Sequence, residues 1–452
     1  MSLPNDVPIP ASLSHASAEW KALVTAFMSH SARTPDALKA LGDTAGETPA
    51  FMAAKGLIFC LLGRRELSDE AHSLSRAARD ALVRHGGDVQ ERALVDALNA
   101  FCAGRPSQAA DIFDQSLTQR PGDGFALKLA QAIRFLYGDS AGMRRSADAA
   151  IYAFDTSHPH AGYARGCYAF ACEETGDLTL AEKAGIRALE LAPDDAWGLH
   201  AVAHVHEMRG HPEQGRAWLL PRQDAFAGCS NFRHHVWWHF ALFELELGHM
   251  DAVLDLYDKE VRREHTDDYR DVANAVSLLA RIEAEGVDVG RRWDELAAIA
   301  ERRVEDGCVV FADLHYLMAL LAAGRNEAAG RLIERMASAG EASEFGRVAA
   351  GPGACAGDGL AAMRRGDHDA AYKSLAASQV RMREIGGSHA QRDVFERLTI
   401  DAALSAGRMV EAREMIKGRA KRRGAFDRFG FERLLRCGPV KVETPVPSGA
   451  AF

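Results

Sequence analysis

A glycine recurs at nearly even intervals along most of this 452-residue chain, and each time a charged residue or histidine follows it. The positions are Gly63, Gly104, Gly138, Gly176, Gly210, Gly248, Gly324, Gly366 and Gly407. From Gly104 the steps are 34, 38, 34, 38, 76, 42 and 41 residues, and the step of 76 fits two units with a degenerate turn near Gly286 or Gly290. Glycine takes positive φ without strain after a helix C-terminus. Repeats of this length indicate stacked helical hairpins.

The composition agrees with helices, because the chain is rich in Ala, Leu, Arg and Glu and poor in strand-like alternation. After Gly176 come Ala181, Ala188 and Pro193, which is typical of the second half of a tetratricopeptide repeat. We therefore predict an all-α, tetratricopeptide-like solenoid that forms a right-handed superhelix. The alternative is an irregular helical bundle in which the spacing is accidental.

The expected organisation has three parts. Residues 1–18 form an N-terminal arm, residues 19–436 form one continuous superhelix of about nine helix pairs, and residues 437–452 form an extended C-terminal tail. The glycine-rich stretch 340–358 is expected to be a longer connection between hairpins.

Charge and cysteine usage limit the classes of function. A net charge of −9 disfavours nucleic-acid binding. The chain has neither a signal-like start nor a run of 18 apolar residues, so we expect no secretion and no membrane span. None of the eight cysteines forms a Cys-x-x-Cys pair, which fits reduced thiols in a cytoplasmic protein and argues against a thiolate zinc site. A homodimer formed through helix faces is compatible with an acidic solenoid, but the sequence identifies no face for it.

Residues 197–246 hold four of the six tryptophans and two histidine-rich stretches. On a helix, His200, His204 and Glu207 share one face, and His235, Trp238 and His239 share another. Since the first helix of each tetratricopeptide pair lines the concave side, we expect these two stripes to be neighbours on one concave groove.

Five segments resemble the tetratricopeptide repeat protein 38 family: 197–208, 235–243, 286–293, 311–319 and 386–395. The resemblance is best over residues 150–405 and implies a helical-repeat, intracellular protein without implying a particular reaction. His234 and Trp237 depart from the family pattern. The matching positions include His200, His204, Glu207, His235, Trp238, His239, Asp313, His315, Gln391, Arg392 and Asp393.

One interpretation of these residues is a metal site. Two histidines four apart on a helix can share a metal, and a second such pair can complete its coordination. The cofactor is unknown, but imidazole suits Zn, Fe, Ni or Cu. Glu207 or Asp313 could then ligate the metal or act as a base on a bound water, although no Glu lies between the histidines as in His-Glu-x-x-His hydrolases. The candidate ligands are His200, His204, His235 and His239.

A second interpretation is a metal-free groove that binds a small molecule or peptide, with Arg392 holding a carboxylate or phosphate. The expected ligand-binding residues are His200, His204, His235, Trp238, His239, His315, Arg392 and Asp393. If the protein is an enzyme, it is a hydrolase or lyase with catalytic His204, Glu207, His239 and Asp313. A third interpretation is structural, because buried histidines are often paired within a polar core network. Ser388 is expected to cap a helix whose start can hold an anion.

Overall fold

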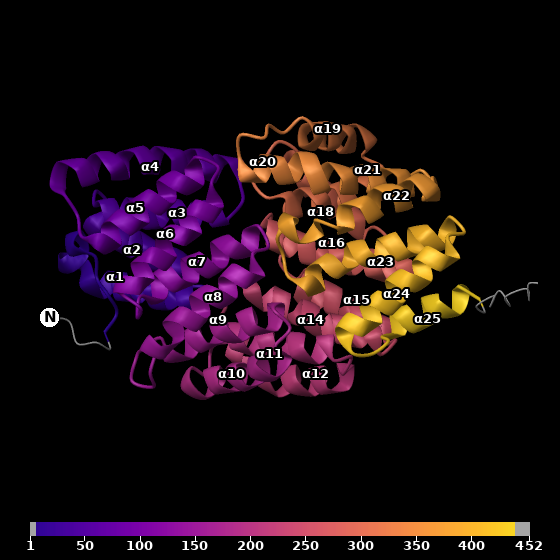
Figure 1. The fold of residues 1–452 in the computed structure, drawn as a ribbon, viewed down its shortest axis with the longest axis horizontal. Helices are drawn as coiled ribbons and strands as arrows, with labels where there is room; N and C mark the ends of the chain where they lie inside the picture. The colour runs from indigo at the N-terminus through magenta and orange to yellow at the C-terminus, as the bar shows by residue number, and fades with distance from the viewer. Residues whose placement is uncertain (1–5, 439–452) are drawn as a thin grey trace, which may run out of the picture.

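The computed structural model describes residues 6–438, which form helices with no β-strand (Figure 1). The region expected to be an arm contains a 3-10 helix, Ala11–Ala16, and the first α-helix begins at Ser17. Leu13 and Ala16 are completely buried, so this segment packs on the body of the protein. The extended tail expected at 437–452 lies outside the described residues, apart from its first two positions.

The first part of the chain forms the group of helices on the left of Figure 1. They are α1 (Ser17–Met28), α2 (Thr34–Ala45), α3 (Pro49–Leu61), α4 (Arg65–His85), α5 (Val89–Cys102), α6 (Pro106–Gln119), α7 (Gly124–Leu136) and α8 (Ser140–Ala150).

The middle part runs along the bottom of the same view. It comprises α9 (Ala161–Glu174), α10 (Leu178–Leu191), α11 (Ala196–Met208), α12 (Pro212–Leu219), α13 (Asp224–Ala227), α14 (Phe232–Glu246) and α15 (Met250–Leu256), the last of which continues into a π-helical segment, Tyr257–Val261.

The last part folds back over the middle part on the right. It comprises α16 (Tyr269–Ala284), α17 (Arg292–Arg302), α18 (Val310–Ala322), α19 (Asn326–Ala337), α20 (Glu344–Val348), α21 (Ala354–Arg364), α22 (His368–Gln379), α23 (His389–Ser405), α24 (Met409–Arg423) and α25 (Arg428–Arg436).

The periodic glycines are the turns of the hairpins, as the sequence predicted. At all nine positions φ lies between +62° and +84°, a region that costs other residues energy but not glycine. They close the pairs α3–α4, α5–α6, α7–α8, α9–α10, α11–α12, α14–α15, α18–α19, α21–α22 and α23–α24. Gly286 and Gly290, both with positive φ, supply the degenerate turn between α16 and α17.

Within a hairpin the first helix is buried and the second helix covers it. In α18 every residue from Val310 to Leu321 is buried, whereas α19 buries only four side chains. A helix that is apolar all round belongs to a protein interior, and an amphipathic helix belongs to its surface. The chain is therefore an all-α, tetratricopeptide-like helical-repeat protein.

Hairpins that are far apart in the sequence also contact one another. The backbone N–H of Ser230 donates to the carbonyl of His30 (2.9 Å), and that of Glu344 donates to the carbonyl of Gly104 (2.9 Å). Arg281 on α16 donates to the carbonyl of Ala390 on α23 (2.9 Å). The late hairpins thus cover the inner helices of the earlier ones.

The glycine-rich stretch 340–358 is not the long connection that we expected. It contains α20, a π-helical segment from Ala349 to Gly353 and the start of α21. Its glycines allow close packing, since a Cβ on Gly353 would lie 2.8 Å from the Val310 side chain. Among residues 6–438, no helix is both long and apolar enough to cross a membrane.

Candidate metal centre

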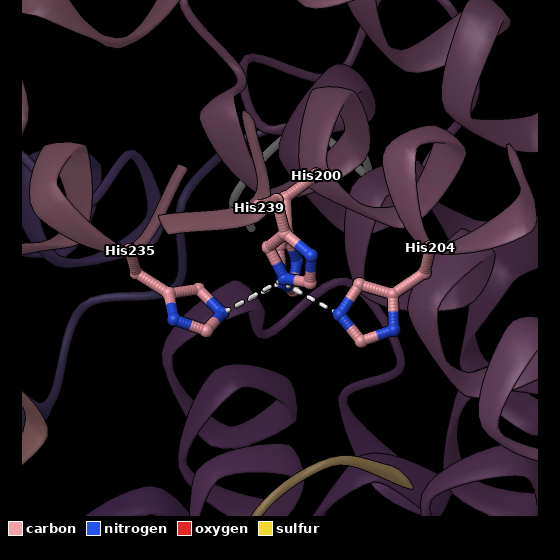
Figure 2. Close-up of side chains that lie close together, drawn as sticks. All are labelled: His200, His204, His235 and His239. Atoms are coloured by element: carbon pink, nitrogen blue, oxygen red, sulfur yellow. Dashed lines mark hydrogen bonds between the residues drawn. The ribbon is translucent and has the colours of Figure 1, made fainter. Parts of the chain in front are cut away.

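Two neighbouring inner helices, α11 and α14, bring four histidines to one point. Asp195 caps the N-terminus of α11, because its carboxylate accepts a hydrogen bond from the Gly198 backbone N–H (3.1 Å). Since residues four apart share a helix face, each helix presents a pair of imidazoles to the other. Figure 2 shows the four rings turned toward a common centre, with His235 and His204 on opposite sides. The four residues are His200, His204, His235 and His239.

The Nε2 atoms face each other at short distances. His200 Nε2 lies 2.9 Å from His204 Nε2 and 3.0 Å from His235 Nε2, and His235 Nε2 lies 3.2 Å from His239 Nε2. One nitrogen of each of the four rings lies within 4.8 Å of the others, and each residue is at most 9% exposed. The cluster is therefore both compact and enclosed.

The other ring nitrogen is directed at an acceptor in three of the four histidines. His204 Nδ1 lies 3.2 Å from Glu173 Oε2, and His239 Nδ1 lies 3.3 Å from Glu207 Oε2. His235 Nδ1 lies 3.0 Å from Asn274 Oδ1. Acceptors at these positions favour the tautomer that carries its proton on Nδ1 and leaves the Nε2 lone pair free.

These tautomers leave the centre with almost no proton to share. His204 Nδ1 has no hydrogen bond of good geometry but lies at ion-pair distance from Glu173, whereas His200 Nδ1 is buried with no polar partner. His200 is therefore the ring that is free to carry its proton on Nε2. That single proton can serve one neighbour, so the His235 and His239 lone pairs still face each other at 3.2 Å. A set of lone pairs that converge without donors is repulsive on its own and favourable around a cation.

Burial favours the neutral form of three of the imidazoles, His200, His235 and His239, and the neutral form is the one that binds metals. Burial, reinforced by the neighbouring histidines, holds the pKa of His200 and of His235 well below the usual 6.5. Burial lowers the pKa of His239 to about 4, despite its hydrogen bond to Glu207. Burial opposes ionisation of Glu207, but His239 and Arg423 outweigh it and hold the pKa of that carboxyl below its usual range.

A second polar group continues from His204. Glu173 lies between His204 and His389, with its Oε1 2.9 Å from His389 Nε2. His389 Nδ1 lies 3.0 Å from Glu174 Oε1, and the same carboxylate oxygen accepts the His389 backbone N–H at 3.0 Å. Although burial opposes it, these two carboxylates raise the pKa of His389 well above its usual value. The start of α23, where we expected an anion, is thus filled by Glu174 of this chain.

The α23 contact also explains why the histidines are enclosed. The His389 ring lies 5.2 Å from the His204 ring. On the concave side expected at these residues, α23 packs against the histidines. Aromatic rings close the remaining sides: Trp238, Trp197, Phe170 and Phe232.

Two predicted site residues lie apart from this cluster. Asp313 forms an ion pair with Arg335 (2.6 Å), and burial raises its pKa to about 6. His315, two residues along α18, has its Nδ1 2.7 Å from the carbonyl of Phe311. No contact in the described part of the chain joins either side chain to the four histidines.

Arg392 and Asp393 are also engaged within the protein. Arg392 donates to the carbonyls of Gly386 and Gly387, and its Nη2 lies 3.7 Å from Glu174. Asp393 accepts from Arg397 (2.7 Å) and Arg419 (2.8 Å). Ser388 caps α23 as predicted, since its hydroxyl accepts the Gln391 backbone N–H at 3.3 Å.

Asp393 belongs to a buried ionic network of arginines and carboxylates beside the histidines. It surrounds a cavity of about 20 Å³, which holds roughly one water. The network therefore fills the space that a small molecule would need. Its members are Arg281, Arg397, Arg419, Arg423, Glu207, Glu246, Asp393 and Asp427.

The sequence interpretation missed the acceptors Glu173, Glu174 and Asn274, and it missed His389, which lies between the two glutamates. The only available signal was that His389 lies in the 386–395 segment.

No family model matches the sequence. Among solved structures, the chain is similar to human IFIT1 bound to PPP-AAAA (14% identity, 82% of this chain and 86% of that chain, TM-score 0.37). It is also similar to a chain of the APC/C hetero-tetramer Cut9–Hcn1 (10% identity, 90% and 85%, TM-score 0.36).

Proposed function

We propose that this helical-repeat protein binds one divalent transition metal inside its repeat stack, on the Nε2 atoms of four histidines. The observation that carries the proposal is the convergence of these lone pairs, with Nδ1 acceptors behind three of them. The ligands are His200, His204, His235 and His239.

The spacing of the nitrogens suits such an ion. Bonds of about 2.0–2.1 Å place neighbouring nitrogens about 3.4 Å apart in a tetrahedron and about 2.9 Å apart in a square plane. The three contacts along the cluster, 2.9–3.2 Å, fall between these values. Imidazole ligands select Zn, Cu, Ni or Fe over Mg and Ca.

The surrounding acceptors support the same function. Metal-bound histidines usually donate their second N–H to a carboxylate or carbonyl, which fixes the ring and strengthens the ligand. Glu173, Glu207 and Asn274 supply these acceptors from α9, α11 and α16. The metal would thereby fasten together the inner helices of successive hairpins.

The test is elemental analysis of protein expressed without a histidine tag and purified without chelator. We expect about one equivalent of a transition metal per chain, lost in His200→Ala and in His235→Ala. His206→Ala is the matched control, because His206 lies on α11 near Trp218, away from the cluster. A folded protein that takes up no Zn, Ni, Cu or Co, or a His200→Ala variant that keeps its metal, overturns the proposal.

A second candidate function is ligand binding at this site, with a small molecule or a peptide as the ligand. In the same candidate, the site could instead catalyse a hydrolase or lyase reaction. The observation that favours it is that His235 is the most exposed of the four ligands, at 9%. A four-histidine site leaves no open position unless one ligand dissociates. Azide added to the cobalt-substituted protein should change its visible spectrum if a position opens, and should leave the spectrum unchanged if the site is closed.

We also propose that the chain is related to the tetratricopeptide repeat protein 38 family. Three of the segments that carry the resemblance contain all four ligands together with Glu207 and His389. These residues come from α11, α14 and α23 and lie side by side in the structure, which supports one shared site rather than separate similarities.

A further inference from the structure

A second chemical site lies away from the histidines, in a cavity lined by a different set of helices. The cavity has a volume of about 370 Å³ and lies where the N-terminal hairpins meet the α17–α18 connection and α20. The contact between Glu344 and Gly104 closes one side of it. Three of the eight cysteines line it: Cys60, Cys102 and Cys308.

The arginines that line this cavity are already paired. Arg64 binds Asp267, and Arg65 donates to the carbonyl of Glu305 (2.8 Å). Arg335 binds Asp313, as described above. Since these cations have partners within the protein, the distinctive chemistry left on the cavity wall is that of the thiols.

Cys60 and Cys102 form a pair. Cys60 is the last residue but one of α3 and Cys102 is the last residue of α5, and both side chains line the same cavity. His72 on α4 lies beside them, with its Nδ1 2.8 Å from the carbonyl of Ser68 and its Nε2 3.0 Å from the carbonyl of Cys102. Only an imidazolium donates from both nitrogens, so this geometry favours a positive charge next to the Cys102 thiol.

The charge environment separates the three thiols. The hydrogen bond from Cys60 is the main cause that lowers the pKa of Cys102 to about 7, with His72, Ser75 and Arg76 adding to it against burial. The same pairing, together with burial, raises the pKa of Cys60, and burial raises the pKa of Cys308 to about 12. The C-terminal end of α5 works against a thiolate. The other titratable groups facing the cavity are Asp69, Glu305, Asp306 and Arg335.

We propose that Cys102 and Cys60 form a dithiol site that reduces small hydroperoxides. The Cys102 thiolate attacks one peroxide oxygen, the O–O bond breaks, and the leaving alkoxide or hydroxide takes a proton, which leaves a sulfenic acid on Cys102. The Cys60 thiol then attacks this sulfur, forms the Cys60–Cys102 disulfide and releases water. The two sulfurs together lose two electrons, and the peroxide gains them. An external thiol returns the pair to the reduced state.

The experiment uses the full-length reduced protein and hydrogen peroxide. After one equivalent of peroxide at pH 7.5, remaining thiols are alkylated and the digest is analysed by mass spectrometry. We expect the Cys60–Cys102 disulfide as the main product, and about tenfold less oxidation at the exposed Cys355. In Cys60→Ser, a sulfenic acid on Cys102 should accumulate and be trapped by dimedone, whereas Cys308→Ser, the matched control, should still form the disulfide.

A measurement on the unmodified protein avoids the risk that a variant misfolds. The iodoacetamide labelling rate of Cys102 should reach half its plateau near pH 7, whereas an ordinary thiol does so near about pH 8.5. Oxidation of Cys355 as fast as Cys102, or absence of the Cys60–Cys102 disulfide in a folded, peroxide-treated protein, overturns the proposal.

Discussion

Two buried polar clusters lie side by side in this protein, and Glu207 touches both. Its carboxylate is 3.3 Å from the His239 ring on one side and 3.7 Å from Arg423 on the other. The ionic network combines four arginines with four carboxylates, so its charges match within the protein. The histidine cluster instead presents like groups to each other, and its neutral rings have almost no donor between them.

The difference separates a structural polar core from a binding site. A network whose members satisfy each other needs no ligand to explain its burial. A cluster whose lone pairs converge is explained by a cation. The same reasoning disfavours Arg392, expected to hold an anion, and Asp393 as ligand-binding residues, because both already form ion pairs within this chain.

The largest effect on folding should come from breaking the ionic network. Asp393→Asn leaves Arg397 and Arg419 buried with one acceptor charge fewer, so the free energy of unfolding should fall by about 3–5 kcal/mol, measured by urea denaturation. The metal content should not change. Asp369→Asn, which affects exposed pairs with Lys373 and Arg408, should leave the urea midpoint nearly unchanged. If Asp393→Asn also loses the metal, the two clusters are one functional unit.

Removing the metal should have the next largest effect. A ligand present at 1,000 times its Kd stabilises the folded state by about 4 kcal/mol. Dialysis against a chelator should therefore lower the thermal midpoint of the parent protein, and added metal should restore it. The His200→Ala variant should melt at the same temperature with or without chelator; a parent protein that is equally indifferent would contradict the metal site.

Acid should distinguish the clusters in the metal-free protein. His239 has a folded pKa of about 4, below the value of about 6.5 expected for an unfolded chain. The unfolded state therefore binds more protons between these values, and stability is lost as the pH falls from 6.5 toward 4. At pH 5 this amounts to about 2 kcal/mol for His239 alone. Asp393 in the ionic network should contribute little over this range, because its arginines hold the pKa of its carboxyl well below 3.8.

Urea midpoints of the metal-free protein at pH 7 and pH 5 test this expectation. His239→Gln should lose less stability than the parent between the two pH values. Asp393→Asn should lose as much as the parent. Equal losses in all three proteins would mean that other groups govern the acid sensitivity.

The smallest expected effect concerns an uncharged acceptor behind the metal ligands. Asn274→Ala removes the partner of His235 Nδ1 and should weaken metal binding by about tenfold, measured by competition with a chromogenic chelator. Ser277→Ala lies one turn along α16, where it loses a hydrogen bond from Trp238 and one that its hydroxyl donates to the carbonyl of Asn274. It leaves the Asn274 side chain in place and should bind as the parent does. Equal affinities for the two variants would remove Asn274 from the site.

The sequence predicted what depends on local spacing. The nine glycine turns, the pairing of His200 with His204 and the pairing of His235 with His239 all follow from helical geometry.

The features that could not be predicted from the sequence depend on contacts between helices that are distant in the chain. Glu173 and His389 are separated by more than two hundred positions, and nothing in either local pattern relates them. The covering of α11 by α23 has the same origin, since the spacing of repeats fixes neighbouring hairpins but not how far the superhelix curls onto itself. For the same reason, the sequence could not predict whether the concave groove is open or covered.

The contacts between early and late hairpins affect how the chain folds and whether single hairpins can be removed from it. In an open repeat array each unit touches only its neighbours, so units can unravel, or be deleted, one at a time. Here Ser230 bonds to His30, and Glu344 bonds to Gly104. Such long-range closure raises contact order, which slows folding, and ties the two ends of the array into one cooperative unit. Excision of a single internal hairpin should therefore abolish folding of the whole chain rather than shorten it.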